Sequence, residues 1–420
     1  MKLDNKRFTN KGSKTGFPLI LYILGILLII VGLIRLITLN PANSGIILDF
    51  NTYYQSAKQL IAGQSIYSIG FKHNQTPLTA ILFIPLTYLS YENSATVWTV
   101  LTIIAYICMG IIILRVQNIK ISFHWNFLLL GIALTWYPFL IHISMGQINI
   151  LISLIIIMSW AFLRRKQEFM GGFLLGLACA LKIFPGIFIL FLVLRKRWTA
   201  TIVMIGTIIA GFIISALVIG PKEVMYYFTN VISQDSKEWF AYPLNLSPTS
   251  TIYMIFTDNR WVYPVMNARF LASITMLLLD IGLAVYLLYK LITLPKSILG
   301  DDLAYGFCII SMLLIAPLTW QHIFPILLLP LSILFKSYLD QQNVHHRNQA
   351  LLSFLFLSIP GGEIVLFVTE MTRLPKIPWY LALPIQLPLL GVFILMISLM
   401  NYKPFSSPKT RNDPIVDTHP

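Results

Sequence analysis

Charge is what this sequence has least of. Asp, Glu, Lys and Arg make up 11% of the 420 residues, whereas a soluble globular protein carries about 25%. Hydrophobic residues make up 57% and the mean hydropathy is +0.77, which excludes a soluble fold and indicates a polytopic membrane protein. The net charge of +14 gathers at the ends of apolar segments, as the positive-inside rule requires, so it does not indicate a nucleic-acid partner.

Cysteine is also scarce, and no repeat of fixed period occurs. Cys108, Cys179 and Cys308 all lie inside apolar segments, so we expect buried thiols and no disulfide framework. The first apolar segment, about 17–39, is too long for a cleavable signal peptide and no small-residue cleavage site follows it. The lack of repeats gives no support to the internal symmetry of many transporters.

Several signatures of enzyme chemistry are missing. The sequence has no zinc signature, no glycine-rich phosphate loop and no convincing Ser-His-Asp set. It also lacks a tight group of carboxylates, and a divalent metal needs two or more oxygen ligands close together. We therefore expect chemistry that needs neither a metal nor another cofactor.

Twelve apolar segments predict the membrane topology. Their approximate bounds are 17–39, 96–115, 124–143, 148–163, 170–181, 184–194, 199–220, 263–290, 302–318, 323–339, 350–370 and 379–402. With these crossings, every strongly basic cluster falls on one side, which is the predicted cytoplasmic side. We expect an all-α polytopic membrane protein with one transmembrane domain over 17–402. Cytoplasmic tails at 1–16 and 403–420, outer loops at 40–95 and 221–262, and a short re-entrant or interfacial piece at 78–90 complete this prediction.

The stretch 170–194 allows two interpretations. As one helix, it places Arg195, Lys196 and Arg197 outside, against the charge rule. Two short helices, about 170–181 and 184–194, keep both flanking basic clusters inside and place Lys182 at the tip of a hairpin. We prefer the hairpin.

The first outer loop contains an amphipathic helix headed by a carboxylate. At helical spacing, the residues that share one side are Phe50, Tyr53, Tyr54, Ala57, Leu60 and Ile61. Asp49 stands at the N-terminus, where the helix dipole favours a negative charge. Asp49 is therefore either a simple N-cap or a functional acid at the membrane surface.

Polar residues gather on the outer face of this topology. They are Asp49, Tyr53, His73, Gln147, Asn149, Lys182, Asn245, Ser247, Arg269 and His322. Polar groups at membrane depth are costly and are usually functional or paired. Lys182 therefore predicts an anion site, such as a lipid phosphate, with a buried pair to Asp280 as the alternative. His322 and Arg269 are further phosphate candidates. A surface histidine at a helix end is the alternative for His322, and snorkelling is the default explanation for Arg269.

Five motifs, in order, resemble one known family. They are Asp49-Phe50 with Tyr53-Tyr54 and Gly63-Gln64-Ser65-Ile66-Tyr67, Gly146-Gln147-Ile148-Asn149-Ile150-Leu151, Gly171 to Gly176 with Ala180 to Pro185 around Lys182, Asn245-Leu246-Ser247, and Pro317 to His322. This order is similar to that of the integral-membrane glycosyltransferase family 87, which contains polyprenol-phosphate-mannose-dependent alpha-1,2-mannosyltransferases. The chain departs from the family pattern at Leu246, where Gln is expected, and at Gln321, where an acidic residue is common.

The resemblance implies a GT-C-type fold and a polyprenyl-phosphate sugar as donor, with reaction on the non-cytoplasmic side. It implies that Asp49 is the general base, that transfer inverts the anomeric configuration, and that a lipid-linked or glycan acceptor receives a hexose, mannose first of all. Lys182, Arg269 and His322 then stabilise the leaving lipid phosphate. The residues expected to bind sugar or acceptor are Tyr53, Tyr54, Gln147, Asn149, Asn245 and Ser247.

Two other functions remain open at this point. A transporter or flippase of a lipid-linked sugar uses Lys182 and Asp280 as a membrane charge pair, and a non-catalytic protein of envelope assembly needs neither. The size and the lack of targeting extensions favour a bacterial inner membrane.

Overall fold

The computed structural model describes residues 16–44, 49–67, 75–232 and 237–402. The two predicted cytoplasmic tails lie almost entirely outside this part of the chain, and so does His73. The described chain is helical almost throughout, which confirms an all-α polytopic class. From the N-terminus, the elements are α1 (Gly16–Thr38), α2 (Pro41–Ser44), α3 (Asp49–Ile61), α4 (Pro77–Phe83), η1 (Ile84–Tyr88), α5 (Tyr91–Val116), α6 (Phe123–Thr135), α7 (Tyr137–Met145), α8 (Asn149–Arg164), α9 (Glu168–Leu181), η2 (Phe184–Ile187), α10 (Phe188–Leu194) and α11 (Trp198–Ile219).

The second half begins with a short helical connection and then returns through the membrane domain. Its elements are α12 (Pro221–Tyr226), η3 (Tyr227–Val231), α14 (Pro248–Phe256), β1 (Val262–Tyr263), α15 (Arg269–Thr293), α16 (Ile298–Ile315), η4 (Gln321–Leu327), α17 (Leu328–Gln341), α18 (Val344–Leu357), α19 (Gly361–Thr372), β2 (Ile377–Pro378), α20 (Trp379–Ala382), η5 (Leu383–Gln386) and α21 (Leu387–Met400).

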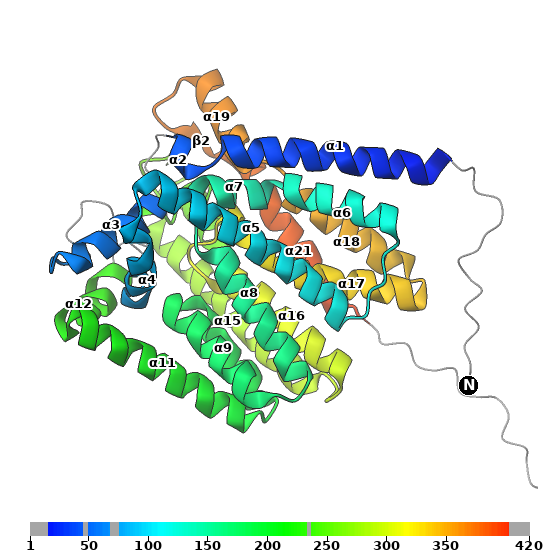
Figure 1. The fold of residues 1–420 in the computed structure, drawn as a ribbon. Helices are drawn as coiled ribbons and strands as arrows, with labels where there is room; N and C mark the ends of the chain where they lie inside the picture. Colours follow the sequence, from blue (N-terminus) through cyan, green and yellow to red (C-terminus); the bar gives the residue numbers. More distant parts are fainter. Residues whose placement is uncertain (1–15, 45–48, 68–74, 233–236, 403–420) are drawn as a thin grey trace, which may run out of the picture.

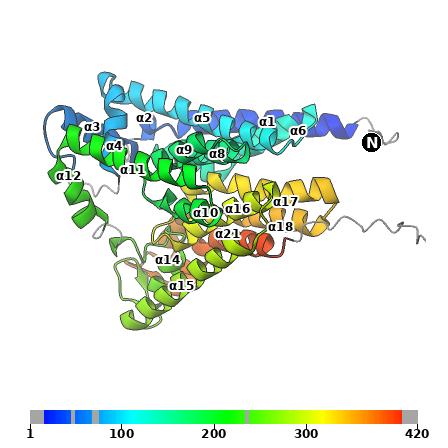
Figure 2. The ribbon, with the colours of Figure 1, turned by 90° about the horizontal axis from the view of Figure 1, so that it is seen from below.

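The helices form layers around a buried centre. Figure 1 shows α1 and α6 side by side along one edge, and Figure 2 shows α15 on the opposite side, with α8, α9 and α16 between them. The centre is α16, whose side chains are buried along most of its length. The outer helices α1, α11 and α15 expose large apolar side chains, such as Leu217 and Phe270. Such surfaces suit contact with lipid tails.

Seven of the predicted crossings are single helices long and apolar enough to span a bilayer, among the described residues. Two bent pairs, α6 with α7 and α18 with α19, raise this number to nine if each pair counts as one span. The bends follow from proline, because Pro138 opens α7 and Pro360 precedes α19. The remaining three, α8, α9 and the η2–α10 piece, are shorter, so the count of twelve stays a prediction.

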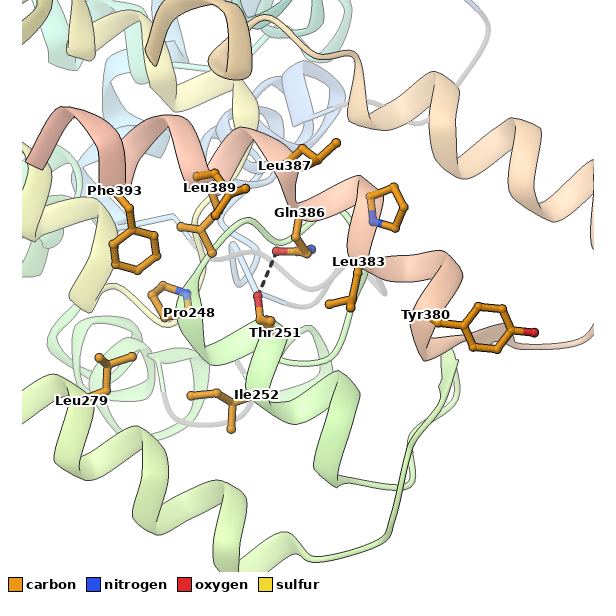
Figure 3. A pocket seen from close by; sticks show the side chains of 12 residues that line it. Pro248, Thr251, Ile252, Leu279, Tyr380, Leu383, Gln386, Leu387, Leu389 and Phe393 are labelled. Atoms are coloured by element: carbon orange, nitrogen blue, oxygen red, sulfur yellow. Dashed lines mark hydrogen bonds between the residues drawn. The ribbon is translucent and has the colours of Figure 1, made fainter. Parts of the chain in front are cut away.

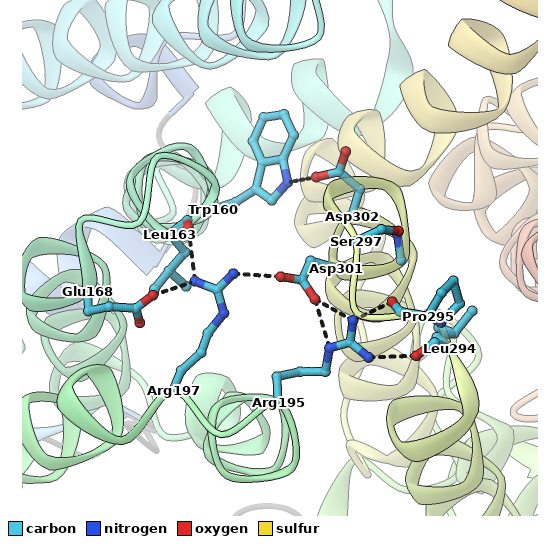
Figure 4. Close-up of polar contacts among 11 residues, drawn as sticks. Trp160, Leu163, Glu168, Arg195, Arg197, Leu294, Pro295, Ser297, Asp301 and Asp302 are labelled. Carbon is cyan, nitrogen blue, oxygen red and sulfur yellow. Dashed lines mark hydrogen bonds and ion pairs between the residues drawn. The ribbon is translucent and has the colours of Figure 1, made fainter.

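The stretch 170–194 is a hairpin, as preferred from the charge pattern. α9 ends at Leu181, and the next helical turn begins at Phe184. We call the two ends of the hairpin, near Glu168 and near Arg195 to Arg197, its feet. The feet lie side by side, because Arg197 Nη1 is 2.8 Å from Glu168 Oε1 at the start of α9. Asp301, at the start of α16, accepts hydrogen bonds from Arg195 Nε at 2.7 Å and from Arg197 Nη2 at 2.6 Å (Figure 4). These charges therefore anchor both feet at one end of the bundle.

Glycine sets the distance between this hairpin and α11. A Cβ on Gly172 would lie 2.3 Å from the backbone oxygen of Ala200, and one on Gly176 would lie 2.5 Å from Thr207 Cβ. The two helices approach this closely only without those side chains, which is a common device in membrane bundles. The short piece predicted at 78–90 is α4 followed by η1, and it packs against α3 and α11.

The end of the bundle opposite the charged feet carries a small cap. β1 pairs in parallel with β2 over two residues, with Val262 opposite Ile377. This pairing shortens the span predicted to begin at 263, since α15 starts at Arg269. Beside the cap, an apolar cavity of about 600 Å³ lies between α14, α15 and the η5–α21 segment (Figure 3).

Candidate active site

Asp49 opens α3 at the capped end of the molecule. Helix α3 is amphipathic as predicted, with Phe50, Tyr53 and Tyr54 buried, whereas Ile61 at its end is exposed. Burial raises the pKa of Asp49, while a hydrogen bond from Gln147 and the charge of Lys182 act in the opposite direction. Lys182 is therefore near Asp49 without forming an ion pair with it.

Gln147 connects the carboxylate to its surroundings. Its Nε2 donates to Asp49 Oδ2, and its Oε1 accepts from Tyr53 Oη at 2.7 Å and from Asn149 Nδ2 at 3.4 Å. Asn149 Oδ1 in turn accepts from Lys182 Nζ at 2.8 Å. We call Asp49, Tyr53, Gln147, Asn149 and Lys182 the outer polar cluster. The amide orientations are consistent along this chain of bonds, since each oxygen accepts and each nitrogen donates.

The tight turn between α7 and α8 fixes the position of Gln147. Gly146 ends α7 in the left-handed region at φ 62°, and a Cβ there would lie 2.4 Å from Phe50 Cβ. Trp98 Nε1 donates to the carbonyl oxygen of Gly146 at 3.0 Å. A glycine is therefore needed both for the backbone conformation and for the close approach of α3.

Lys182 stands at the tip of the hairpin in extended backbone. The carbonyl oxygen of Leu181, at the end of α9, accepts from the hydroxyls of Thr76 and Thr79 at 3.0 and 2.9 Å. The ammonium lies 5.7 Å from the ring centroid of Phe184 and bonds to a neutral amide. The alternative pair with Asp280 does not form in the described chain, which removes the charge pair on which the transporter hypothesis depended.

His322 enters the same neighbourhood from η4. It is 8% exposed, stacks on Trp320, and its backbone oxygen accepts from His142 Nδ1 at 3.1 Å. The two imidazole centroids are 6.3 Å apart, and the charge of Lys182 acts on both rings. The structure thus brings Asp49, Lys182 and His322 together from three distant parts of the sequence.

The capped end supplies no obvious cage for a metal ion. Within the described ranges, no three His, Cys, Asp or Glu side chains converge. The outer polar cluster holds one carboxylate, one ammonium and several neutral hydrogen-bonding groups, a set suited to proton transfer and to binding an anion.

Comparison with known protein families identifies the family to which the chain belongs. The sequence profile of glycosyltransferase family 87 matches residues 75–317, more than half of the chain. The chain belongs to this family.

Two relatives come from Mycobacterium tuberculosis. One is a polyprenol-phosphate-mannose-dependent alpha-(1-2)-phosphatidylinositol mannoside mannosyltransferase, 24% identical over 215 residues, which are 44% of this chain and 48% of the relative. The other is a polyprenol-phosphate-mannose-dependent alpha-(1-2)-phosphatidylinositol pentamannoside mannosyltransferase, 27% identical over 317 residues, 73% of this chain and 68% of the relative. The matched region thus spans about half of the first relative's length. No solved structure is similar to the chain at a significant level.

The family match covers only part of the site. It includes Gln147, Asn149 and Lys182, but it starts after Asp49 and ends before His322. Those two residues join the site of this family 87 protein through the contacts described above.

Two predicted ligand residues instead hold a loop. Asn245 Nδ2 donates to the carbonyl oxygen of Pro317 at 2.9 Å, and its Oδ1 accepts from the amide of Thr319 at 2.9 Å. Ser247 Oγ also donates to Pro317 at 3.0 Å and accepts from Ser250 at the start of α14. These bonds fix the segment that leads into His322, and a direct contact with sugar or acceptor stays a prediction for both residues.

Two other candidates lie apart from the cluster. Tyr54 is buried, and its hydroxyl donates to Leu89 at 2.9 Å, so it packs α3 against η1. Arg269 is exposed at the first residue of α15. In the described chain neither side chain bonds to the outer polar cluster, and a role of Arg269 in phosphate binding stays a prediction.

Sequence reasoning missed His142. It is fully buried in α7, amid the apolar stretch that precedes Gly146. A histidine within an apolar crossing is a recognisable signal, but nothing local to it indicates that it contacts His322, which lies 180 positions later. Gln321, next to His322, is also buried and donates from Nε2 to the carbonyl oxygens of Leu357 at 3.0 Å and Ile359 at 2.6 Å.

Proposed function

We propose that this protein is an inverting membrane glycosyltransferase of the GT-C type, which moves a hexose from a polyprenyl-phosphate sugar to a lipid-linked or glycan acceptor. Mannose is the sugar in the names of both relatives. The observation that carries the proposal is the arrangement of Asp49 and Lys182 at opposite ends of the Gln147–Asn149 bridge.

Asp49 is the proposed general base. A partly buried carboxylate with a raised pKa is a better proton acceptor near neutral pH than an exposed one. It takes the proton of the acceptor hydroxyl as the oxygen attacks the anomeric carbon, and the bond from that carbon to the phosphate oxygen breaks. One displacement needs one base and inverts the configuration. Among the described residues, Asp49 is the one carboxylate bonded into the outer polar cluster, which favours this single step.

Lys182 is the proposed phosphate ligand. Its hydrogen-bonding partner in the cluster is neutral, so its positive charge is available to an anion at the same depth. The negative charge that develops on the leaving phosphate is stabilised there more strongly than in water, because the surroundings are apolar. His322 is the proposed donor of a second hydrogen bond to that phosphate, since it lies within the electrostatic reach of Lys182.

A lipid-linked substrate suits the surroundings of the site. The cavity in Figure 3 is lined mainly by apolar side chains, including Leu279 and Phe393, and Pro248 at its wall follows Ser247 directly. Ser247 is bonded to the loop that leads to His322. The cavity therefore offers an apolar space for part of an alkyl chain.

We further propose that the site faces the non-cytoplasmic side of a bacterial inner membrane. The Arg195 and Arg197 network and the outer polar cluster lie at opposite ends of the hairpin. Positive charge favours the cytoplasmic side, so the cluster faces away from it, and both chain ends are cytoplasmic.

Transfer by Asp49→Asn tests the proposal. Membranes containing the variant are incubated with polyprenyl-phosphate mannose and a lipid acceptor, and product is measured by mass spectrometry. Loss of the base is expected to lower the rate at least a hundredfold, whereas Asp340→Asn, an exposed aspartate paired with Lys336, keeps the wild-type rate. We propose that no metal is needed, so EDTA leaves the wild-type rate unchanged. Wild-type turnover by Asp49→Asn would eliminate Asp49 as the base.

A further inference from the structure

His142 has a defined protonation pattern because of its partner. Its Nδ1 lies 3.1 Å from the backbone oxygen of His322. A carbonyl oxygen only accepts hydrogen bonds, so this contact favours the tautomer with its hydrogen on Nδ1, and the backbone of Gln147 also contacts the ring. The ring is fully buried and close to the Lys182 ammonium. A second positive charge there is costly to bury, so the ring is neutral and Nε2 carries a lone pair.

The Nε2 atom of His142 is buried and has no hydrogen-bond partner in the described chain. The same is true of Nε2 of His322. Leaving a buried polar nitrogen unpaired costs about 1–3 kcal/mol, whether it is a donor or an acceptor. The two rings lie 6.3 Å apart between centroids, and the charge of Lys182 acts on both, so a polar ligand group that enters beside Lys182 can complete this hydrogen bonding.

The chemistry of His142 restricts that ligand group. A phosphate oxygen that carries no hydrogen cannot bond to an acceptor, whereas a hydroxyl can donate to it. We propose that His142 Nε2 accepts a hydrogen bond from a sugar hydroxyl of the lipid-linked donor, beside Lys182, which holds the phosphate. This inference rests on the proposed function, and it assigns to His142 a role in recognising the sugar. The competing interpretation is that His142 only positions the His322 loop.

Two substitutions separate the two ring nitrogens. In His142→Asn, the amide nitrogen takes the place of Nδ1 and keeps the bond to His322, while the acceptor at Nε2 is lost. In His142→Gln, the amide reaches the place of Nε2 and supplies an acceptor oxygen, while the Nδ1 donor is lost. His345→Asn is the matched control, since His345 is exposed at the start of α18. Thermal unfolding in nanodiscs shows which variants are folded.

The readout is the ratio of two dissociation constants, for polyprenyl phosphate and for polyprenyl-phosphate mannose, measured in nanodiscs without acceptor. We expect the wild type and His345→Asn to prefer the mannosylated lipid. We expect His142→Asn to lower this preference about five- to tenfold with unchanged affinity for polyprenyl phosphate, and His142→Gln to retain most of it.

Each outcome decides between the hypotheses. An unchanged preference in His142→Asn, or a larger loss in His142→Gln than in His142→Asn, overturns sugar recognition by His142 and supports the positioning role. If His142→Asn does not fold, the result for His142→Gln decides alone, because retained preference supports recognition and lost preference opposes it. A wild-type protein without any preference for the mannosylated lipid contradicts the proposed function itself.

Discussion

Lys182 directs its ammonium to the side-chain oxygen of Asn149, 2.8 Å away, although Asp49 lies in the same cluster. A neutral partner holds the lysine in place without cancelling its charge. The hairpin tip therefore presents a positioned cation at the depth where a lipid phosphate lies.

Replacing Asn149 by Asp tests the value of that neutral partner. The new carboxylate pairs with Lys182 and reduces its attraction for a phosphate. We expect the affinity for polyprenyl phosphate to fall about tenfold, whereas Asn259→Asp, in the loop before β1, leaves it unchanged. An Asn149→Asp protein that binds polyprenyl phosphate as tightly as the wild type rules out a phosphate role for Lys182.

The acid limb of the pH–rate profile is expected to report the ionisation of Asp49. The base must be ionised, so kcat/KM falls as the pH decreases through its pKa, and burial places that inflection above the usual range of an aspartate. The Gln147 bond and the Lys182 charge both lower this pKa. We therefore expect Gln147→Leu and Lys182→Ala each to move the inflection to higher pH. A shift to lower pH in either variant contradicts the arrangement.

Gly146 and Gly63 form a matched pair of glycines for a stability test. Both have positive φ, 62° and 69°, but a Cβ on Gly63 meets nothing within 4 Å, whereas one on Gly146 meets Phe50. We expect Gly63→Ala to cost about 1–2 kcal/mol from backbone strain alone, and Gly146→Ala about 1–3 kcal/mol more from the clash. Thermal unfolding in nanodiscs gives both values. Equal losses of stability in the two variants would show that α3 does not pack closely against the turn at Gly146.

Asp301→Asn tests the anchor of the hairpin at the far end. It leaves Arg195, whose side chain is 2% exposed, without its carboxylate partner, so we expect a loss of about 1–3 kcal/mol in stability. Affinity for polyprenyl phosphate should change less than in Asn149→Asp, because the hairpin tip keeps its own bonds to Thr76 and Thr79. A selective loss of affinity at full stability indicates that the feet, and not the tip, set the position of Lys182.

The sequence carried much of the fold because membrane insertion leaves strong local signals. The lengths of the apolar segments predicted where the helices lie. The basic residues at 195–197 correctly predicted a hairpin and not a single crossing. Helical spacing also gave the buried face of α3. Ile61, which was predicted on the same side, is exposed at the last residue of the helix.

The site was harder to predict, because its contacts join positions far apart in the chain. A lone Asp49, an intramembrane Lys182 and a turn at Gln147 each attract notice from sequence. Which of them meet is decided by how α3, the hairpin and η4 pack, and no local pattern encodes that. For the same reason the sequence did not indicate that the side-chain amide of Asn245 bonds to the backbone at Pro317 and Thr319, and its contact with a ligand stays a prediction.

Gln321 uses both hydrogens of its amide on the carbonyls of Leu357 and Ile359, where α18 gives way to α19. An ionised acid at this position has no hydrogen to offer them. Any homologue with Glu or Asp there must therefore close the end of α18 by another route, so position 321 and residues 357–361 are expected to change together during evolution.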